Sequence, residues 1–257
     1  MNAIDWSPLV SALDAWRAEG RAADFWLRDD DAVAPTEALS RLLDLCGRHR
    51  IPATLAVIPA HAVPSLAQRL AGLDDVHVAL HGWSHENHAP PDEKKQELGA
   101  HRAAEVVLME LATGVERLRT MFGPRFVPVL VPPWNRIDTA LLPRLAGIGI
   151  AALSVFGAEK SGPLPVVNTH ADIMDWHGTR GCRPAGAIIA DIVKRLAAMR
   201  ATGGCMGLLT HHLVHDEAAW IFLEEMFAVT AGHSGCRWRA LPDLVAEADL
   251  PFRAYSS

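Results

Sequence analysis

Two histidines spaced four residues apart, His81 and His85, directly follow an apolar segment of the chain. Within one helical turn this spacing directs both imidazoles to the same side, where they can chelate a divalent cation. Three successive aspartates, Asp29, Asp30 and Asp31, follow another apolar segment. One carboxylate can bind the cation while a second takes a proton from water, and the bound dication keeps both ionised despite their mutual repulsion. These residue types predict metal-assisted hydrolysis.

Each motif also has a purely structural interpretation. The chain contains 13 histidines, and the pairs His77/His81 and His211/His215 share the same spacing, so solvated or core histidines would account for an isolated pair. The aspartates would fit a solvated turn or a helix cap before Pro35, because burying unpaired carboxylates inside a strand is costly. Both motifs directly follow predicted strands, and this position favours a metal site over the structural interpretations.

A third histidine, His211, stands directly after a short apolar segment and is a candidate general acid. A catalytic imidazole needs a carboxylate that holds its tautomer and raises its pKa, and Asp175 is the candidate; an ordinary loop salt bridge is the alternative for Asp175. The indoles of Trp83 and Trp134 would either pack at the mouth of the fold or form a flat apolar wall for a sugar ring.

Short apolar segments alternate with amphipathic helical stretches, which predicts a parallel sheet or a (β/α) barrel. In such folds the chemistry collects at the carboxyl ends of the strands. Five strand ends, one of them in the irregular region 150–176, carry carboxylates, imidazoles or a Trp/Pro turn, so we expect them to converge on one rim. The clearest predicted strands are 25–27, 53–58, 76–80, 126–131 and 207–209. The predicted helices are 7–20, 35–46, 64–71, 92–121, 138–146, 184–196, 217–231 and 241–248.

The composition fits one large α/β domain. The chain has 257 residues, of which 50% are hydrophobic and 21% charged, enough for a sizeable core. Its 24 Lys+Arg against 30 Asp+Glu give a net charge of −6 without a basic block, which argues against nucleic acid or an anionic membrane as partner. No apolar run is long enough for a membrane span and no secretory leader is visible, so we expect a cytoplasmic protein.

The motifs, in this order, resemble those of the NodB-type polysaccharide deacetylases, carbohydrate esterase family 4, over residues 24–216. The resemblance implies an α/β fold, a single-domain distorted (β/α)7 barrel. Residues 1–23 would form a helix packing on the barrel and residues 24–257 the barrel itself. It also implies one divalent metal, usually Zn²⁺, and hydrolysis of N- or O-acetyl groups on sugars or of acyl groups on other amides.

The family's first motif is an Asp-Asp pair in which the first residue is the base and the second a metal ligand, and the triple aspartate fits it in two registers. Spacing to the following helix fits Asp30 as base and Asp31 as ligand better. A shift by one makes Asp29 the base and Asp30 the ligand. The second motif, His-[Ser/Thr]-x-x-His, resembles the segment from His81 to His85, which implies that both imidazoles bind the metal.

The sequence departs from the family pattern in two places. Gly82 stands where the second motif usually has a hydroxyl residue. The third motif, usually Arg-Pro-Pro-Tyr-Gly, corresponds to Val131-Pro132-Pro133-Trp134-Asn135, so the arginine that pairs with the base is missing. Arg28 and Arg136 are the candidates to replace it. By the resemblance, the Trp134 backbone N–H supplies the oxyanion contact.

The fourth and fifth motifs resemble Asp175-Trp176 and Leu208-x-x-His211. The resemblance therefore implies that His211, oriented by Asp175, protonates the departing amine or alcohol. The residues expected to contact the substrate are Trp83, Pro133, Asn135, Arg136 and Trp176.

Two other functions would use the same fold. The missing third-motif arginine favours a catalytically weak or inactive barrel that binds carbohydrate, whereas the intact Asp, His and acid positions oppose it. A metal-dependent phosphoesterase would usually need further carboxylates for a second metal and a basic phosphate clamp, neither of which is evident. Because no leader is visible, we expect a small molecule or a glycan precursor as the substrate.

Overall fold

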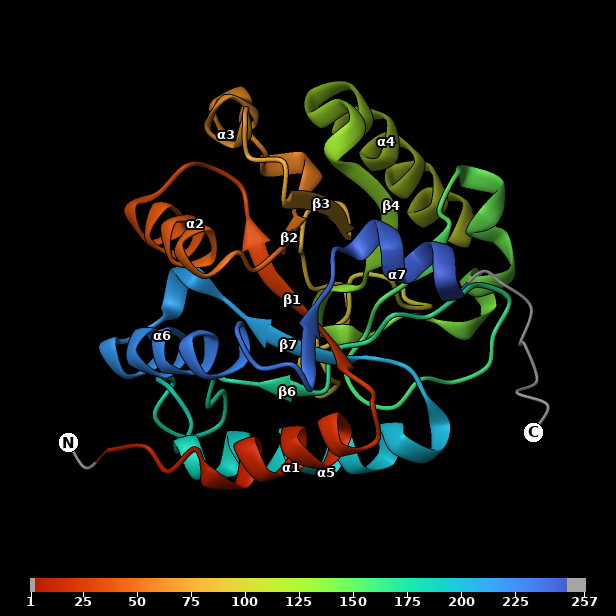
Figure 1. Ribbon diagram of the computed structural model, residues 1–257. Coiled ribbons are helices and arrows are strands. Elements are labelled where there is room, and N and C mark those ends of the chain that lie inside the picture. The colour runs from red at the N-terminus through yellow and green to blue at the C-terminus, as the bar shows by residue number, and fades with distance from the viewer. Residues whose placement is uncertain (1–2, 249–257) are drawn as a thin grey trace.

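A computed structural model describes residues 3–248 as one curled parallel sheet surrounded by helices (Figure 1). The ends of the two expected domain ranges, residues 1–2 and 249–257, lie outside the described residues. The strand order is β5-β4-β3-β2-β1-β7-β6, and β8 pairs with β1 beside this path. The strands are β1 (Ala23–Ala32), β2 (Ala53–Val57), β3 (Val76–His81), β4 (Phe126–Val131), β5 (Ala152–Leu153), β6 (Ala171–Asp172), β7 (Met206–Thr210) and β8 (Cys236–Trp238).

The two ends of this sheet, β5 and β6, are joined by irregular backbone. The Leu153 amide donates to the Pro165 carbonyl and the Thr169 amide to the Val155 carbonyl, so the segment between β5 and β6 bridges the gap. A parallel sheet that curls but closes incompletely is the predicted distorted (β/α)7 barrel, in a single domain.

Helices cover the outside of the sheet (Figure 1). α1 and α5 lie side by side, and Leu9 and Leu13 of α1 share a buried cluster with Ile188 and Ile192 of α5. α2 begins where the Thr36 hydroxyl accepts from the Leu39 amide, a helix cap. The α-helices are α1 (Ser7–Ala18), α2 (Glu37–His49), α3 (Pro64–Leu70), α4 (Ala104–Phe122), α5 (Ala185–Thr202), α6 (Glu217–Thr230) and α7 (Leu241–Ala248). The 3₁₀ helices are η1 (Pro59–His61), η2 (Gly123–Arg125), η3 (Pro133–Asn135), η4 (Thr139–Arg144), η5 (Ala146–Ile148) and η6 (His212–Val214).

Helix α7 closes one end of the barrel. Its Leu241 and Leu244 are buried in a cluster with Trp26 and Val127, which lie near the starts of β1 and β4. The amino-terminal end of the barrel is therefore packed with apolar side chains, and the polar residues that follow the strands lie at the opposite end.

Two predicted helices differ from the structure. The helix expected at 92–121 begins only at Ala104, because the preceding segment is held by tertiary contacts; the Glu97 side chain is buried and accepts hydrogen bonds from the backbone of another loop. The helix expected at 138–146 is instead 3₁₀ helix with Pro143 inside it, and proline removes an α-helical hydrogen bond. Strand β8 was not predicted. Within residues 3–248, no helix has the length and apolarity needed to cross a membrane.

Candidate active site

The three aspartates lie inside strand β1, whereas the sequence predicted that they follow a strand of 25–27, with a solvated turn or helix cap as the structural alternative. That alternative assumed unpaired carboxylates, whereas two of these side chains are buried with partners. Because side chains alternate along a strand, Asp30 shares the barrel interior with Arg28 while Asp29 points to the other face. There Asp29 accepts from the Thr210 hydroxyl at 2.7 Å and pairs with His212. Burying a carboxylate is costly unless it is paired, and both buried aspartates have partners: Thr210 and His212 for Asp29, and Arg28 for Asp30.

Asp30 is held by a fully buried arginine. The Arg28 Nε and Nη2 atoms donate to the two oxygens of Asp30 at 2.8 and 3.0 Å, a bidentate pair that fixes the carboxylate plane. Arg28 also donates to Ser154 Oγ at 2.8 Å and to Asn135 Oδ1 at 3.2 Å. Arg136 donates instead to the Lys95 carbonyl. Of the two candidates for the missing arginine, the structure therefore places Arg28 on the carboxylate.

Asp31 lies against both histidines of the second motif. Its Oδ1 atom is 3.1 Å from His81 Nε2 and 3.4 Å from His85 Nε2. Ligand atoms bound about 2.0–2.1 Å from a tetrahedral metal are themselves about 3.4 Å apart, which matches these separations. Among the described residues, Asp31, His81 and His85 form the one group of three acidic, His or Cys side chains with ligand atoms within 4.8 Å of each other. This donor set fits a zinc-like cation.

The His81 ring has the orientation that a metal ligand needs. Its Nδ1 atom lies 2.9 Å from the Val131 carbonyl oxygen, so Nδ1 carries the hydrogen and Nε2 faces Asp31. Burial disfavours the charged imidazole, but the hydrogen bond to Asp31, the charges of Asp30 and Asp31 and the bond to Val131 together outweigh it and raise the pKa of His81. Burial and the neighbouring His81 lower the pKa of His85. Burial opposes ionisation of Asp31 too, yet the hydrogen bond from His81 and the nearby imidazoles hold the pKa of Asp31 far below its usual range.

A buried carboxylate explains the glycine in the second motif. Glu97 Oε1 accepts from the Trp83 and Ser84 amides at 3.1 and 2.7 Å and so caps the turn that leads to His85. Gly82 has a φ of 59°, and a Cβ added there would lie 2.0 Å from Glu97 Oε2 and 2.6 Å from Pro133. The space that the family's hydroxyl residue would need is therefore filled by Glu97.

We expect Gly82→Ala to lower the free energy of unfolding by about 1–3 kcal/mol, the usual cost of overpacking a buried position. The same change should weaken metal binding, because the turn carries His81 and His85. Gly99 in the adjacent loop has a negative φ, and the atoms nearest to a Cβ added there belong to the flexible end of Gln96 and to His101, so Gly99→Ala is the control. Urea unfolding and metal titration of both variants measure the difference; equal behaviour would contradict the packing argument.

His211 follows β7 and lies near the base candidate. Its Nε2 is 4.0 Å from Asp30 Oδ2, and its ring meets the Trp176 indole edge to face at 4.6 Å. Trp176 Nε1 in turn donates to Asp172 Oδ2 at 2.8 Å. Burial raises the pKa of Asp172, and His211 counteracts this shift. Asp172 was missed from the sequence, although it ends strand β6, the same signal that identified the other residues.

The expected pairing of Asp175 with His211 is not formed. The Asp175 carboxylate accepts from the Gly178 and Thr179 amides at 3.0 and 2.9 Å and caps its own loop. Those hydrogen bonds, led by the one from Thr179, lower the pKa of Asp175. Asp175 follows the end of β6 by three residues and so lies in the loop beyond the strand. Asp172 is the last residue of β6 and lies near His211.

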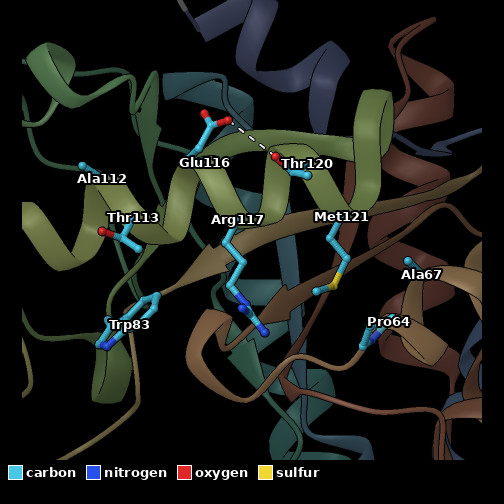
Figure 2. Close-up of a pocket in the computed structure, with 9 residues that line it drawn as sticks. All are labelled: Pro64, Ala67, Trp83, Ala112, Thr113, Glu116, Arg117, Thr120 and Met121. Carbon is cyan, nitrogen blue, oxygen red and sulfur yellow. Dashed lines mark hydrogen bonds between the residues drawn. The ribbon is translucent and has the colours of Figure 1, made fainter.

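Two of the expected aromatic residues take different places. Trp134 has a left-handed backbone with φ 54°, and its ring lies 4.3 Å from that of His85, so it packs on a proposed ligand. Trp83 instead lines a groove of about 930 Å³ beside α3 and α4 together with Arg117 and Met121 (Figure 2). The expected sugar-facing wall at Trp83 is thus corrected: the turn capped by Glu97 directs this indole to the outside of the barrel. Pro133 is buried beside Gly82, and Asn135 contacts Arg28.

Solved structures share this fold. A candidate polysaccharide deacetylase from Mycobacterium smegmatis superposes with a TM-score of 0.67 at 18% identity, covering 88% of this chain and 89% of that one. A family 4 carbohydrate esterase from Streptomyces lividans, solved with acetate, gives 0.54 at 17% identity over 82% and 88%. A family 4 acetyl xylan esterase from Clostridium thermocellum, solved with cobalt, gives 0.53 at 15% identity over 89% and 93%.

Sequence comparison gives a separate result. No curated protein matched the sequence significantly. The family model described as polysaccharide deacetylase matches residues 24–153, which is half of the chain. The match includes β2 to β5 and all but the first residue of β1, with the three aspartates, His81, His85 and the Trp134 segment. The chain therefore belongs to the polysaccharide deacetylase family.

Proposed function

We propose that this protein is a metal-dependent hydrolase that removes an acetyl group from a sugar or a small amide or ester. The observation that carries the proposal is the placement of Asp31, His81 and His85 around one point, with the Arg28–Asp30 pair on the same strand end. The esterase relatives solved with acetate and with cobalt are consistent with this chemistry.

In this proposal Asp31, His81 and His85 hold the cation, most simply Zn²⁺ because imidazole and carboxylate ligands suit it. When bound, the cation supplies a Lewis acid that lowers the pKa of a water and polarises the acyl oxygen. Asp30 takes a proton from the water while the water oxygen forms a bond to the acyl carbon. Arg28 holds the Asp30 carboxylate in place and compensates its charge until Asp30 takes up the proton.

The remaining residues stabilise charge and complete the proton transfer. The Trp134 amide is proposed to donate to the developing oxyanion, a contact worth about 3–4 kcal/mol in enzymes of known mechanism. As the bond from the acyl carbon to the leaving nitrogen or oxygen breaks, His211 gives its proton to that atom. The products are the free acid and an amine or alcohol. Asn135, Arg136, Pro133 and Trp176 are proposed to contact the substrate around this centre.

The Arg28–Asp30 pair also bears on the alternative function. A non-catalytic carbohydrate-binding barrel was favoured by the missing third-motif arginine. A buried guanidinium now stands on the proposed base, supplied by strand β1 instead of the third motif. This supports the hydrolase over the binding module.

The test combines metal analysis with acetate release from a panel of acetylated sugars. We expect about one divalent ion per chain, loss of acetate release after chelation, and recovery on adding Zn²⁺. A ligand present at 100 times its Kd stabilises the fold by about 2.7 kcal/mol, so chelation should also lower the Tm. His81→Ala should abolish binding. His101→Ala is the control, because His101 lies in the neighbouring loop and forms an ion pair with Glu93 away from the three proposed ligands.

Two results would contradict the proposal. Protein that takes up no divalent ion after supplementation would remove the metal-dependent mechanism. Protein that holds the ion but releases acetate from no substrate would instead point to the carbohydrate-binding barrel.

A further inference from the structure

The Asp29 carboxylate is buried between β1 and the segment that carries His211. Its Oδ2 atom accepts from the Thr210 hydroxyl at 2.7 Å and from the His212 amide at 2.9 Å, and its Oδ1 atom pairs with His212 Nδ1. The side chain is fully buried, so these bonds are shielded from water. All three donors belong to the residues on either side of His211.

The Asp29 contact lies where the backbone pairing between β1 and β7 ends. Asp29 pairs with Thr210 in the parallel register of β1 and β7, and β7 ends there. His211 itself has φ −145° and ψ 86° and lies between the strand and η6. Its amide donates to His215 Nε2 at 3.3 Å and not to the sheet. The position of the His211 backbone therefore depends on side-chain bonds, of which Asp29 supplies three.

We propose that Asp29 is a positioning residue that holds the general acid His211 in register with Asp30 and Asp31. One strand would then set the base, a metal ligand and, through Asp29, the acid, which lies 4.0 Å from Asp30. Asp29 touches none of the reacting groups, because its side chain lies on the opposite face of β1 from Asp30. The inference rests on the proposed function, since it assigns His211 the proton donor's role.

The consequence depends on the leaving group. An amine or an alkoxide must be protonated as its bond to the acyl carbon breaks, whereas a nitrophenolate departs unprotonated. A misplaced acid therefore slows amide hydrolysis and leaves aryl ester hydrolysis much less affected. A displacement of about 1 Å in a catalytic group can cost about 10²-fold in rate.

The experiment compares Asp29→Asn with the wild-type holoenzyme on two substrates, an N-acetylated amino sugar and 4-nitrophenyl acetate. Asparagine keeps the shape but has only one acceptor oxygen, so it cannot accept both from His212 Nδ1 and from the Thr210 hydroxyl and His212 amide. We expect kcat for the amide to fall about 10-fold or more with KM unchanged, and kcat for the aryl ester to fall much less. Metal content should equal that of the wild type.

Further variants keep the test decisive if Asp29→Asn folds poorly. His212→Asn retains a donor near the position of Nδ1 and should preserve the ratio of kcat for the amide to kcat for the aryl ester. His212→Ala should lower this ratio. Glu159→Gln is the matched control, because Glu159 also pairs with a buried histidine, His170, at 3.1 Å, but next to Arg195 at the start of β7. It should leave the ratio unchanged.

Equal losses on both substrates, or the same ratio change in Glu159→Gln, would overturn the proposal. A histidine-selective NMR spectrum separates this failure from failure of the proposed function. If the wild type hydrolyses neither substrate, the proposed function fails. A shift of the His211 ring signals in Asp29→Asn would then still show that Asp29 positions His211, and unchanged signals would refute that role.

Discussion

Asp30→Asn is expected to lower kcat about 10²- to 10⁴-fold, the range lost when a general base is removed. The amide keeps the shape of the carboxylate and can still accept from Arg28, but it cannot take the proton of the attacking water. The KM should change little, because the substrate groups are bound elsewhere. Metal content should also be retained, since Asp31 and the two histidines supply the ligands.

The control for this prediction is Asp175→Asn, which makes the same chemical change at the aspartate of the fourth motif. Asp175 caps its own loop through Gly178 and Thr179, so its loss should affect kcat far less. Initial rates on an acetylated sugar, with metal content measured in parallel, distinguish the two. A kcat within tenfold of the wild type for Asp30→Asn, or a larger loss for Asp175→Asn, would refute the assignment of the base.

Arg28→Met is expected to lower the free energy of unfolding by about 3–5 kcal/mol, because it leaves Asp30 buried without its counter-charge. The guanidinium is fully buried and bonds to Asp30, Ser154 and Asn135, so one substitution leaves three groups without their donor. Methionine fills much of the volume, and so the loss reports polar pairing more than a cavity.

Urea unfolding of the variant and of Arg136→Met measures this effect. Arg136 is only partly buried and donates to a single backbone carbonyl, so its variant should lose much less stability. The double variant Arg28→Met/Asp30→Asn should recover part of the loss, because it removes the stranded charge along with its partner. A loss below about 1 kcal/mol for Arg28→Met, or no recovery in the double variant, would contradict a paired buried charge.

The sequence was informative about which residues could react, because the position of a residue after a predicted strand is a local property. His81, His85, His211 and the aspartates were found in this way, and the structure brings them to one end of the barrel. The alternation of strands and helices likewise predicted the barrel, since hydrophobic periodicity is set by neighbours in the chain. Helix 92–121 was too long because the Glu97 segment is held by a distant turn.

Assigning tasks to those residues needed the tertiary structure. Spacing to the following helix favoured Asp30 over Asp29 as the base but left both registers open. The alternation of side chains across the sheet sends Asp29 to His212 and Asp30 to Arg28. The replacement of the third-motif arginine by Arg28 and of the usual hydroxyl residue by Glu97 are contacts between separate segments. The sequence thus determined the fold class and the reactive residue types, whereas the partners of each charge were decided by packing, because pairing depends on distance in space and not along the chain.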